Sequence, residues 1–143
     1  MRTTLFRTSA LATSIIFLAT LTYSEPLPGT TGSAAGASWQ SSWIDLKSPT
    51  TFKKGEKLRI KVEGSAENVL IRLLPAASTP DSSDGIEGSV RKVPPNRILE
   101  VKLERDHPTV KQISVHAGRE AWGRPLGANN GTVKIVSVDR IPK

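Results

Sequence analysis

The chain has 143 residues, with 20 lysines and arginines against 13 acidic residues and a formal net charge of +7. The basic residues are spread along the sequence without a run of five or six. This excludes a nucleic-acid-binding arm and leaves either solubility or a mild attraction to anionic surface polymers as the role of the charge. The absence of cysteine excludes disulfides, a thiol nucleophile and cysteine-bound zinc.

Residues 1–24 have the organisation of a secretory signal peptide. Two early arginines precede Ala10–Leu21, an uncharged and mostly apolar run that is shorter than the roughly 20 residues a membrane-spanning helix needs. Small residues, Thr22 and Ser24, stand before a cleavage point at Glu25. The alternative is an uncleaved anchor or a buried helix. We expect a secreted or periplasmic protein without a transmembrane segment in its mature chain.

The mature chain divides into a leader and one domain. Residues 25–38 are rich in Pro, Gly, Ser, Thr and Ala, which is typical of a flexible leader. Residues 39–143 carry short apolar–polar alternations separated by Gly, Pro and Asn turn signals, with no helical stripe. The predicted strands are Ser42–Lys47, Lys57–Glu63, Asn68–Leu74, Arg97–Glu104, Val110–His116 and Thr132–Ile141. Together they indicate an all-β fold, an antiparallel β-sandwich.

The burial of two strands follows from their residues. In Lys57–Glu63, Leu58, Ile60 and Val62 alternate with charged residues, as in a half-buried strand. Asn68–Leu74 is apolar at nearly every position, which predicts a central strand covered on both sides.

Two long irregular stretches interrupt this pattern. Ala76–Pro95 is predicted to be a single loop, and Ala117–Asn130 carries a tryptophan among glycines. Long loops inside compact domains are often functional or mobile, so both stretches are candidate binding regions.

Three segments resemble galactose-binding-like jelly-roll domains, a class that includes many carbohydrate-binding modules. They are Thr51–Val62 (TFKKGEKLRIKV), Leu99–Gly118 (LEVKLERDHPTVKQISVHAG) and Gly131–Ile141 (GTVKIVSVDRI). The resemblance implies a jelly-roll sandwich and carbohydrate binding. It also implies a structural calcium with Asp139 as a ligand, against the alternative that Asp139 is a surface carboxylate paired with Arg140 or a lysine.

The candidate ligand-binding residues lie in the second irregular stretch. Sugars stack their C–H faces on indole rings, so Trp122 is the first candidate platform, with Arg119, Arg124 and Asn129 as hydrogen-bond donors beside it. Trp39 is a second candidate. The alternative for Trp122 is that it plugs one end of the sandwich.

Other residues that could carry chemistry have structural interpretations. Ser114 and His116 share one face of a predicted strand but lack a nucleophile elbow. His107 precedes Pro108 in a predicted turn and is expected to face solvent, and Trp43 is expected in the core.

No catalytic set emerges from the sequence. We therefore expect a non-catalytic binding module that recognises a carbohydrate or another cell-envelope component. The alternatives are a structural or protein-interaction domain of the periplasm or cell surface, or an enzyme whose site has an unfamiliar arrangement.

Overall fold

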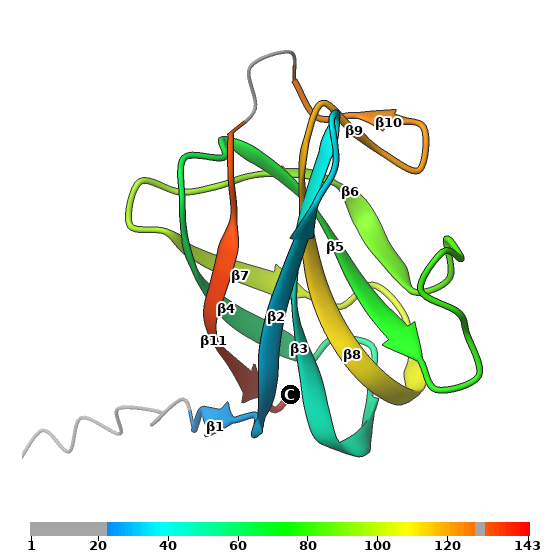
Figure 1. Ribbon diagram of the computed structural model, residues 1–143. Helices are drawn as coiled ribbons and strands as arrows, with labels where there is room; N and C mark the ends of the chain where they lie inside the picture. Colours follow the sequence, from blue (N-terminus) through cyan, green and yellow to red (C-terminus); the bar gives the residue numbers. More distant parts are fainter. Residues whose placement is uncertain (1–22, 128–130) are drawn as a thin grey trace, which may run out of the picture.

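The computed structural model describes residues 23–127 and 131–143, and these contain strands but no helix (Figure 1). One sheet has the order β1–β11–β4–β7: β1 (Glu25–Pro26), β11 (Lys134–Ile141), β4 (Lys57–Glu63) and β7 (Ile98–Lys102). The second has the order β2–β3–β8–β5–β6: β2 (Gly29–Ala35), β3 (Trp39–Phe52), β8 (His107–Gly118), β5 (Asn68–Pro75) and β6 (Ile86–Lys92). In addition, β9 (Glu120–Ala121) and β10 (Arg124–Pro125) form a small hairpin.

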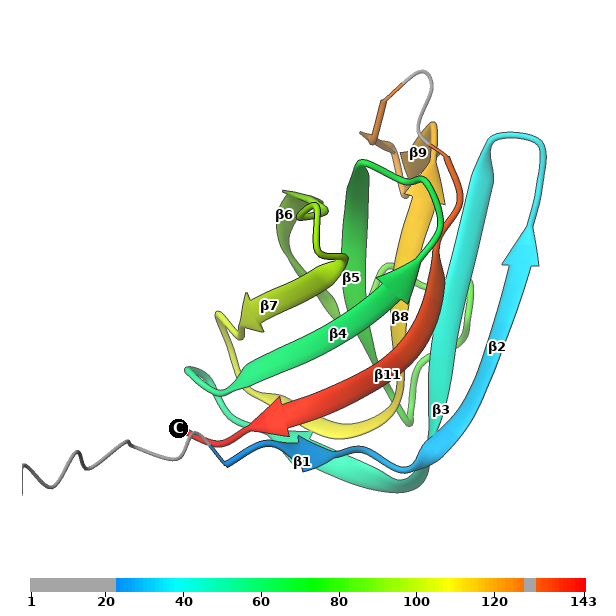
Figure 2. The same cartoon turned by 90° about the vertical axis from the view of Figure 1, so that its left-hand side faces the viewer.

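All of these strand pairings are antiparallel, and the two sheets pack face to face as an open sandwich (Figure 2). This confirms the all-β sandwich expected from the alternating pattern. The described segments include no helix able to cross a membrane. The predicted signal peptide lies almost entirely outside the described residues.

The core lies between the two sheets and is built from alternate residues. Leu58, Ile60 and Val62 of β4 are buried, as the alternation with charged residues predicts. On β5, Ile71 faces this core, whereas Leu70 faces outward into a second cluster beneath the β9–β10 hairpin. The prediction that β5 is covered on both sides is therefore confirmed.

Strand β2 occupies the segment whose composition indicates a flexible leader. Its seven residues pair with β3 from Gly29 opposite Leu46 to Ala35 opposite Gln40. The small residues of β2 accommodate a neighbouring indole: a Cβ on Gly32 would lie 2.7 Å from a carbon of the Trp43 ring. This segment is thus held by its pairing with β3, and its small residues leave room for the Trp43 ring.

Strand β6 lies within the predicted Ala76–Pro95 loop, so the irregular parts of this stretch are residues 76–85 and 93–95. Its inward residue is Glu87, which is fully buried, and Glu87 Oε2 lies 2.5 Å from Nε2 of the equally buried His107. The prediction that His107 faces solvent is wrong, because β8 begins at His107 and turns this side chain toward Glu87. Because the inward residue of β6 is a carboxylate and not an apolar residue, this segment lacks the apolar–polar alternation that would have predicted a strand.

Candidate functional site

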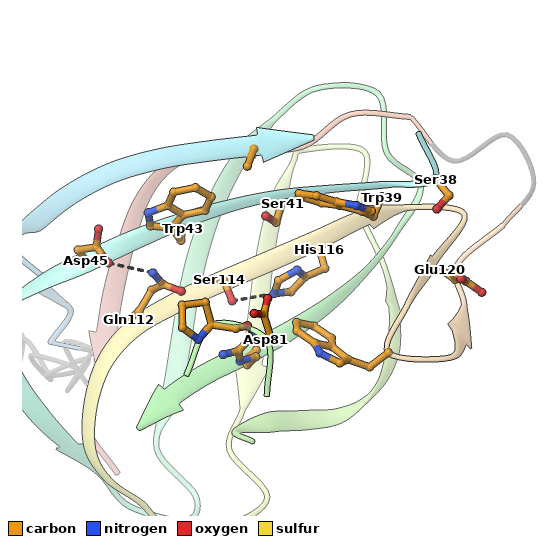
Figure 3. Close-up of a pocket in the computed structure, with 14 residues that line it drawn as sticks. Ser38, Trp39, Ser41, Trp43, Asp45, Asp81, Gln112, Ser114, His116 and Glu120 are labelled. Carbon is orange, nitrogen blue, oxygen red and sulfur yellow. Dashed lines mark hydrogen bonds between the residues drawn. The ribbon is translucent and has the colours of Figure 1, made fainter. Parts of the chain in front are cut away.

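A groove crosses the outer face of the five-stranded sheet, on the side away from the core. Its volume is about 690 Å³, and it is lined by residues of β2, β3, β8 and β5, by the loop after β5 and by the β9–β10 hairpin (Figure 3). Outward-facing residues of β3, β8 and β5 form much of its floor: Ser41, Gln112, Ser114, His116 and Arg72.

Two tryptophans of β3 line one side of the groove. Trp39 and Trp43 are four residues apart and therefore share one face of the strand. Trp39 is 46% exposed, and Trp43 is partly buried against Gly32 of β2. The expectation that Trp43 lies in the core is wrong, because Ser42 and Ile44 are the inward residues of β3.

Trp122 also lines the groove, from the two-residue turn that joins β9 to β10. Trp122 has a φ of 46° and Gly123 a φ of 72°, and Ala121 pairs directly with Arg124. Positive φ at both central positions is the requirement of a type I′ turn, where Asn-Gly is favoured. A tryptophan there costs on the order of 1–2 kcal/mol of backbone strain, which the packing of its side chain has to offset.

The Trp122 ring packs against two residues of the groove floor. The Arg72 guanidinium lies 4.8 Å from the ring centroid, and the His116 ring contacts Trp122 edge-on with centroids 4.4 Å apart. Trp122 is only partly buried and lines the groove. Trp122 thus lines the groove while it also packs against the second apolar cluster of Leu70, Ala121 and Leu126.

Arg72 connects this tryptophan to the loop on the same side of the groove. Its Nη1 donates a hydrogen bond to the Pro80 carbonyl at 2.8 Å and its Nη2 to the Thr79 carbonyl at 3.2 Å. Burial lowers the pKa of Arg72, while the charges of Asp84 and Asp81 act in the opposite direction. The buried cation therefore holds both the loop and the indole in place.

Ser114 and His116 are hydrogen-bonded on the floor, with 2.8 Å between Oγ and Nε2. Burial, together with the charge of Arg72, lowers the pKa of His116 to about 3. An imidazole of so low a pKa is a weak general base at neutral pH. Among the described residues, no carboxylate is hydrogen-bonded to this ring to orient it. The hydrogen bond joins two neighbouring side chains of β8 on the groove floor.

Three exposed carboxylates complete the lining. Asp45 accepts a hydrogen bond from the Gln112 amide at 2.9 Å, so its second oxygen remains available. Asp81 comes from the loop held by Arg72, and Glu120 from β9. In Figure 3, Asp45 and Glu120 lie at opposite ends of the groove, with Asp81 between them.

The other predicted contact residues lie elsewhere. Arg119 and Arg124 are exposed but do not line the groove, and Arg124 Nη1 donates to the Gly88 carbonyl at 2.6 Å. Asn129 lies outside the described residues. Asp139 stands on β11 opposite Arg59, and no group of three His, Cys, Asp or Glu side chains gathers within the described ranges. Its role as a calcium ligand stays a prediction.

The sequence held a signal for several residues that were missed. Trp43 and Asp45 are alternate residues of one predicted strand, and Gln112, Ser114 and His116 are alternate residues of another. Polar and aromatic side chains on one face of two predicted strands are expected to meet if the strands are neighbours. The pairing of β3 with β8 supplies that missing step.

Comparisons of the chain with models of protein families, with curated proteins and with solved structures found no match. The functional argument therefore rests on the groove itself.

Proposed function

We propose that this protein is an exported, non-catalytic module that binds a carbohydrate in the groove on its five-stranded sheet. The observation that carries the proposal is the pair of indoles on β3, Trp39 and Trp43, above a floor of hydroxyl, amide and imidazole groups. Sugar rings present C–H faces that stack on aromatic rings, and their hydroxyls bind amides and carboxylates. Both kinds of contact are available to one ligand in this groove.

The size and supports of the groove agree with this proposal. Its volume of about 690 Å³ is in the range of small-molecule sites. Trp43 packs on Gly32, Trp39 on Gly36, and Trp122 is held by Arg72, so all three rings are positioned without a ligand. Such preorganisation lowers the entropy that binding would otherwise lose.

The resemblance to galactose-binding-like domains supports the same reading from the sequence. It implies a jelly-roll connection of the strands and an accessory, sugar-binding role. The absence of an activated base beside Ser114 supports a binding role rather than catalysis. The expected signal peptide supports a periplasmic or secreted location, where cell-envelope polysaccharides are accessible.

A second candidate, a protein-interaction domain, is favoured by one observation. Strand β2 is an edge strand of seven uncharged residues, GTTGSAA, and it is exposed along almost its whole length. Uncharged edges can accept a strand from another chain. Replacing Thr31 by lysine would block such pairing, and an unchanged elution volume and partner profile in this variant would argue against it.

The proposal is tested by retention of the purified protein on a panel of insoluble and immobilised polysaccharides at low and high salt. We expect salt-resistant retention on one or a few glycans, and its loss in Trp43→Ala and Trp39→Ala. Val136→Ala is the matched control, because Val136 is 42% exposed on β11 of the other sheet. Retention only on anionic polymers and only at low salt would refute the proposal.

A further inference from the structure

We infer that the ligand of this groove is an extended, uncharged glycan chain of several sugar units, and that anionic glycans are excluded from it. This rests on the proposed function and adds the length and charge of the ligand. It follows from two separate features of the lining: the spacing of the indoles on β3, and the balance of charges around them.

The spacing of the two tryptophans on β3 determines how long the ligand must be. Trp39 and Trp43 are separated by four residues of an extended strand, or about 13 Å at 3.3 Å per residue. A single sugar ring covers about one indole and cannot contact both. Asp45 lies beyond Trp43 at one end of the groove, and Glu120 lies at the other end (Figure 3). A ligand that uses the whole lining has to be a chain that follows β3.

The charges of the groove lining determine which charge a ligand can carry. Asp45, Asp81 and Glu120 contribute three negative charges, and Arg72 contributes one positive charge, which gives a formal balance of −2. His116 adds no charge at neutral pH, since its pKa is lowered to about 3. The groove is therefore negative on a chain whose formal net charge is +7.

Among the described residues that line the groove, Arg72 is the one cation, and it is not available to an anionic ligand. Arg72 is 2% exposed, and its two terminal nitrogens donate to the Thr79 and Pro80 carbonyls. A uronate, sulfate or phosphate group in the groove would meet carboxylates, and the described part of the lining offers it no free cation to pair with. Like charges brought together in this way act against the wrong ligand. Carboxylates can instead accept hydrogen bonds from the hydroxyls of an uncharged sugar.

Titration calorimetry with defined oligosaccharides tests the inference. The probes are the glucose, mannose and xylose β-1,4-linked hexasaccharides, the disaccharide of each, and the α-1,4-linked galacturonate hexamer. We expect one uncharged hexasaccharide to bind at least about tenfold more tightly than its disaccharide, with little dependence on salt. The galacturonate hexamer should not displace it.

A variant that lacks two of the groove carboxylates distinguishes electrostatic exclusion of galacturonate from a steric mismatch. Asp45→Asn/Asp81→Asn should gain at least about fivefold in affinity for the galacturonate hexamer, whereas Glu63→Gln, which removes an exposed carboxylate on β4 of the opposite sheet, should not. The inference is overturned if the disaccharide binds as tightly as the hexasaccharide, or if galacturonate displaces the uncharged chain from the wild-type groove. Either result would leave the proposed carbohydrate-binding function intact. Absence of binding by every probe, together with no retention on the polysaccharide panel, would refute both.

Discussion

Replacing Arg72 by methionine should loosen one side of the groove while leaving the sandwich folded. Methionine preserves the apolar length of the side chain and removes the guanidinium that donates to the Thr79 and Pro80 carbonyls. It also removes the cation that lies 4.8 Å from the Trp122 ring centroid. The loop over residues 76–85 and the β9–β10 hairpin should both become more mobile.

The expected loss of stability is the difference between opposing contributions. Two hydrogen bonds from a charged group contribute roughly 3–6 kcal/mol together, and the contact with the ring adds about 1 kcal/mol. Removing a buried charge regains several kcal/mol of desolvation. Thr79 and Pro80 are exposed residues, so water can hydrogen-bond to their carbonyls in the variant. We therefore expect the free energy of unfolding to fall by about 1–3 kcal/mol, with a decrease in Tm of about 4–12 °C.

Thermal unfolding and amide hydrogen exchange measure the two effects separately. Arg59→Met is the matched control, because Arg59 loses the same charge from an exposed ion pair on the other sheet, and its effect should stay within about 0.5 kcal/mol. Faster exchange over residues 76–85 is expected in Arg72→Met alone. Unchanged exchange in this loop, or a Tm equal to that of the control, would refute the positioning role of Arg72.

Three further predictions concern the core and the groove. Glu87→Gln should lower the free energy of unfolding by about 3 kcal/mol in urea denaturation, because it leaves a buried histidine without its carboxylate. Burial alone would raise the pKa of Glu87, but its hydrogen bonds outweigh burial, and the pKa is lowered from 4.5. The stabilisation by Glu87 should therefore be full above about pH 4.5 and lost as the pH falls further. An unchanged urea midpoint in Glu87→Gln would contradict the stabilising role of this carboxylate. Because the pKa of His116 is lowered to about 3, the free energy of unfolding should decrease by up to about 1.4 kcal/mol for each unit that the pH falls from 6.5 to 3. His116→Gln should flatten this slope in Tm measurements. Equal slopes in the variant and the wild type would contradict the prediction. Gly32→Val should displace the Trp43 ring, cost about 1–3 kcal/mol and reduce glycan retention, whereas Thr31→Val should do neither; retention at the wild-type level would show that the contact is unimportant.

The fold was predictable wherever one strand carried its own burial signal. Strand β4 begins and ends at the predicted residues, since Leu58, Ile60 and Val62 alternate with charges. Strands β2 and β6 carry no such signal. The apolar partner of β2 is Trp43 on the next strand, and β6 buries Glu87 against a histidine that lies far along the chain. These strands depend on contacts with residues of other strands, which the hydrophobic periodicity of a single segment cannot reveal.

The candidate site was predictable in part for the same reason. Trp122 was identified by residue type and by its turn-rich surroundings, and Trp39 by residue type; both line the groove. Trp43 was wrongly assigned to the core because apolar–polar alternation separates the residues of a strand into two faces without showing which face points into the core. Arg72 was missed because its value depends on the loop and the hairpin that fold over β5. The faces of a strand are fixed only once the register with its neighbours is known.

The most direct test of glycan binding in the groove is a ¹⁵N NMR titration that follows the three indole N–H signals. The titrant is the glycan that the polysaccharide panel retains, added as a soluble oligosaccharide, with the signals assigned by Trp→Phe variants. We predict saturable shifts of the Trp39 and Trp43 indoles, together with the amides of Gln112 and His116 on the groove floor. Saturable shifts confined to the four-stranded sheet, with the indole signals unmoved, would contradict the account.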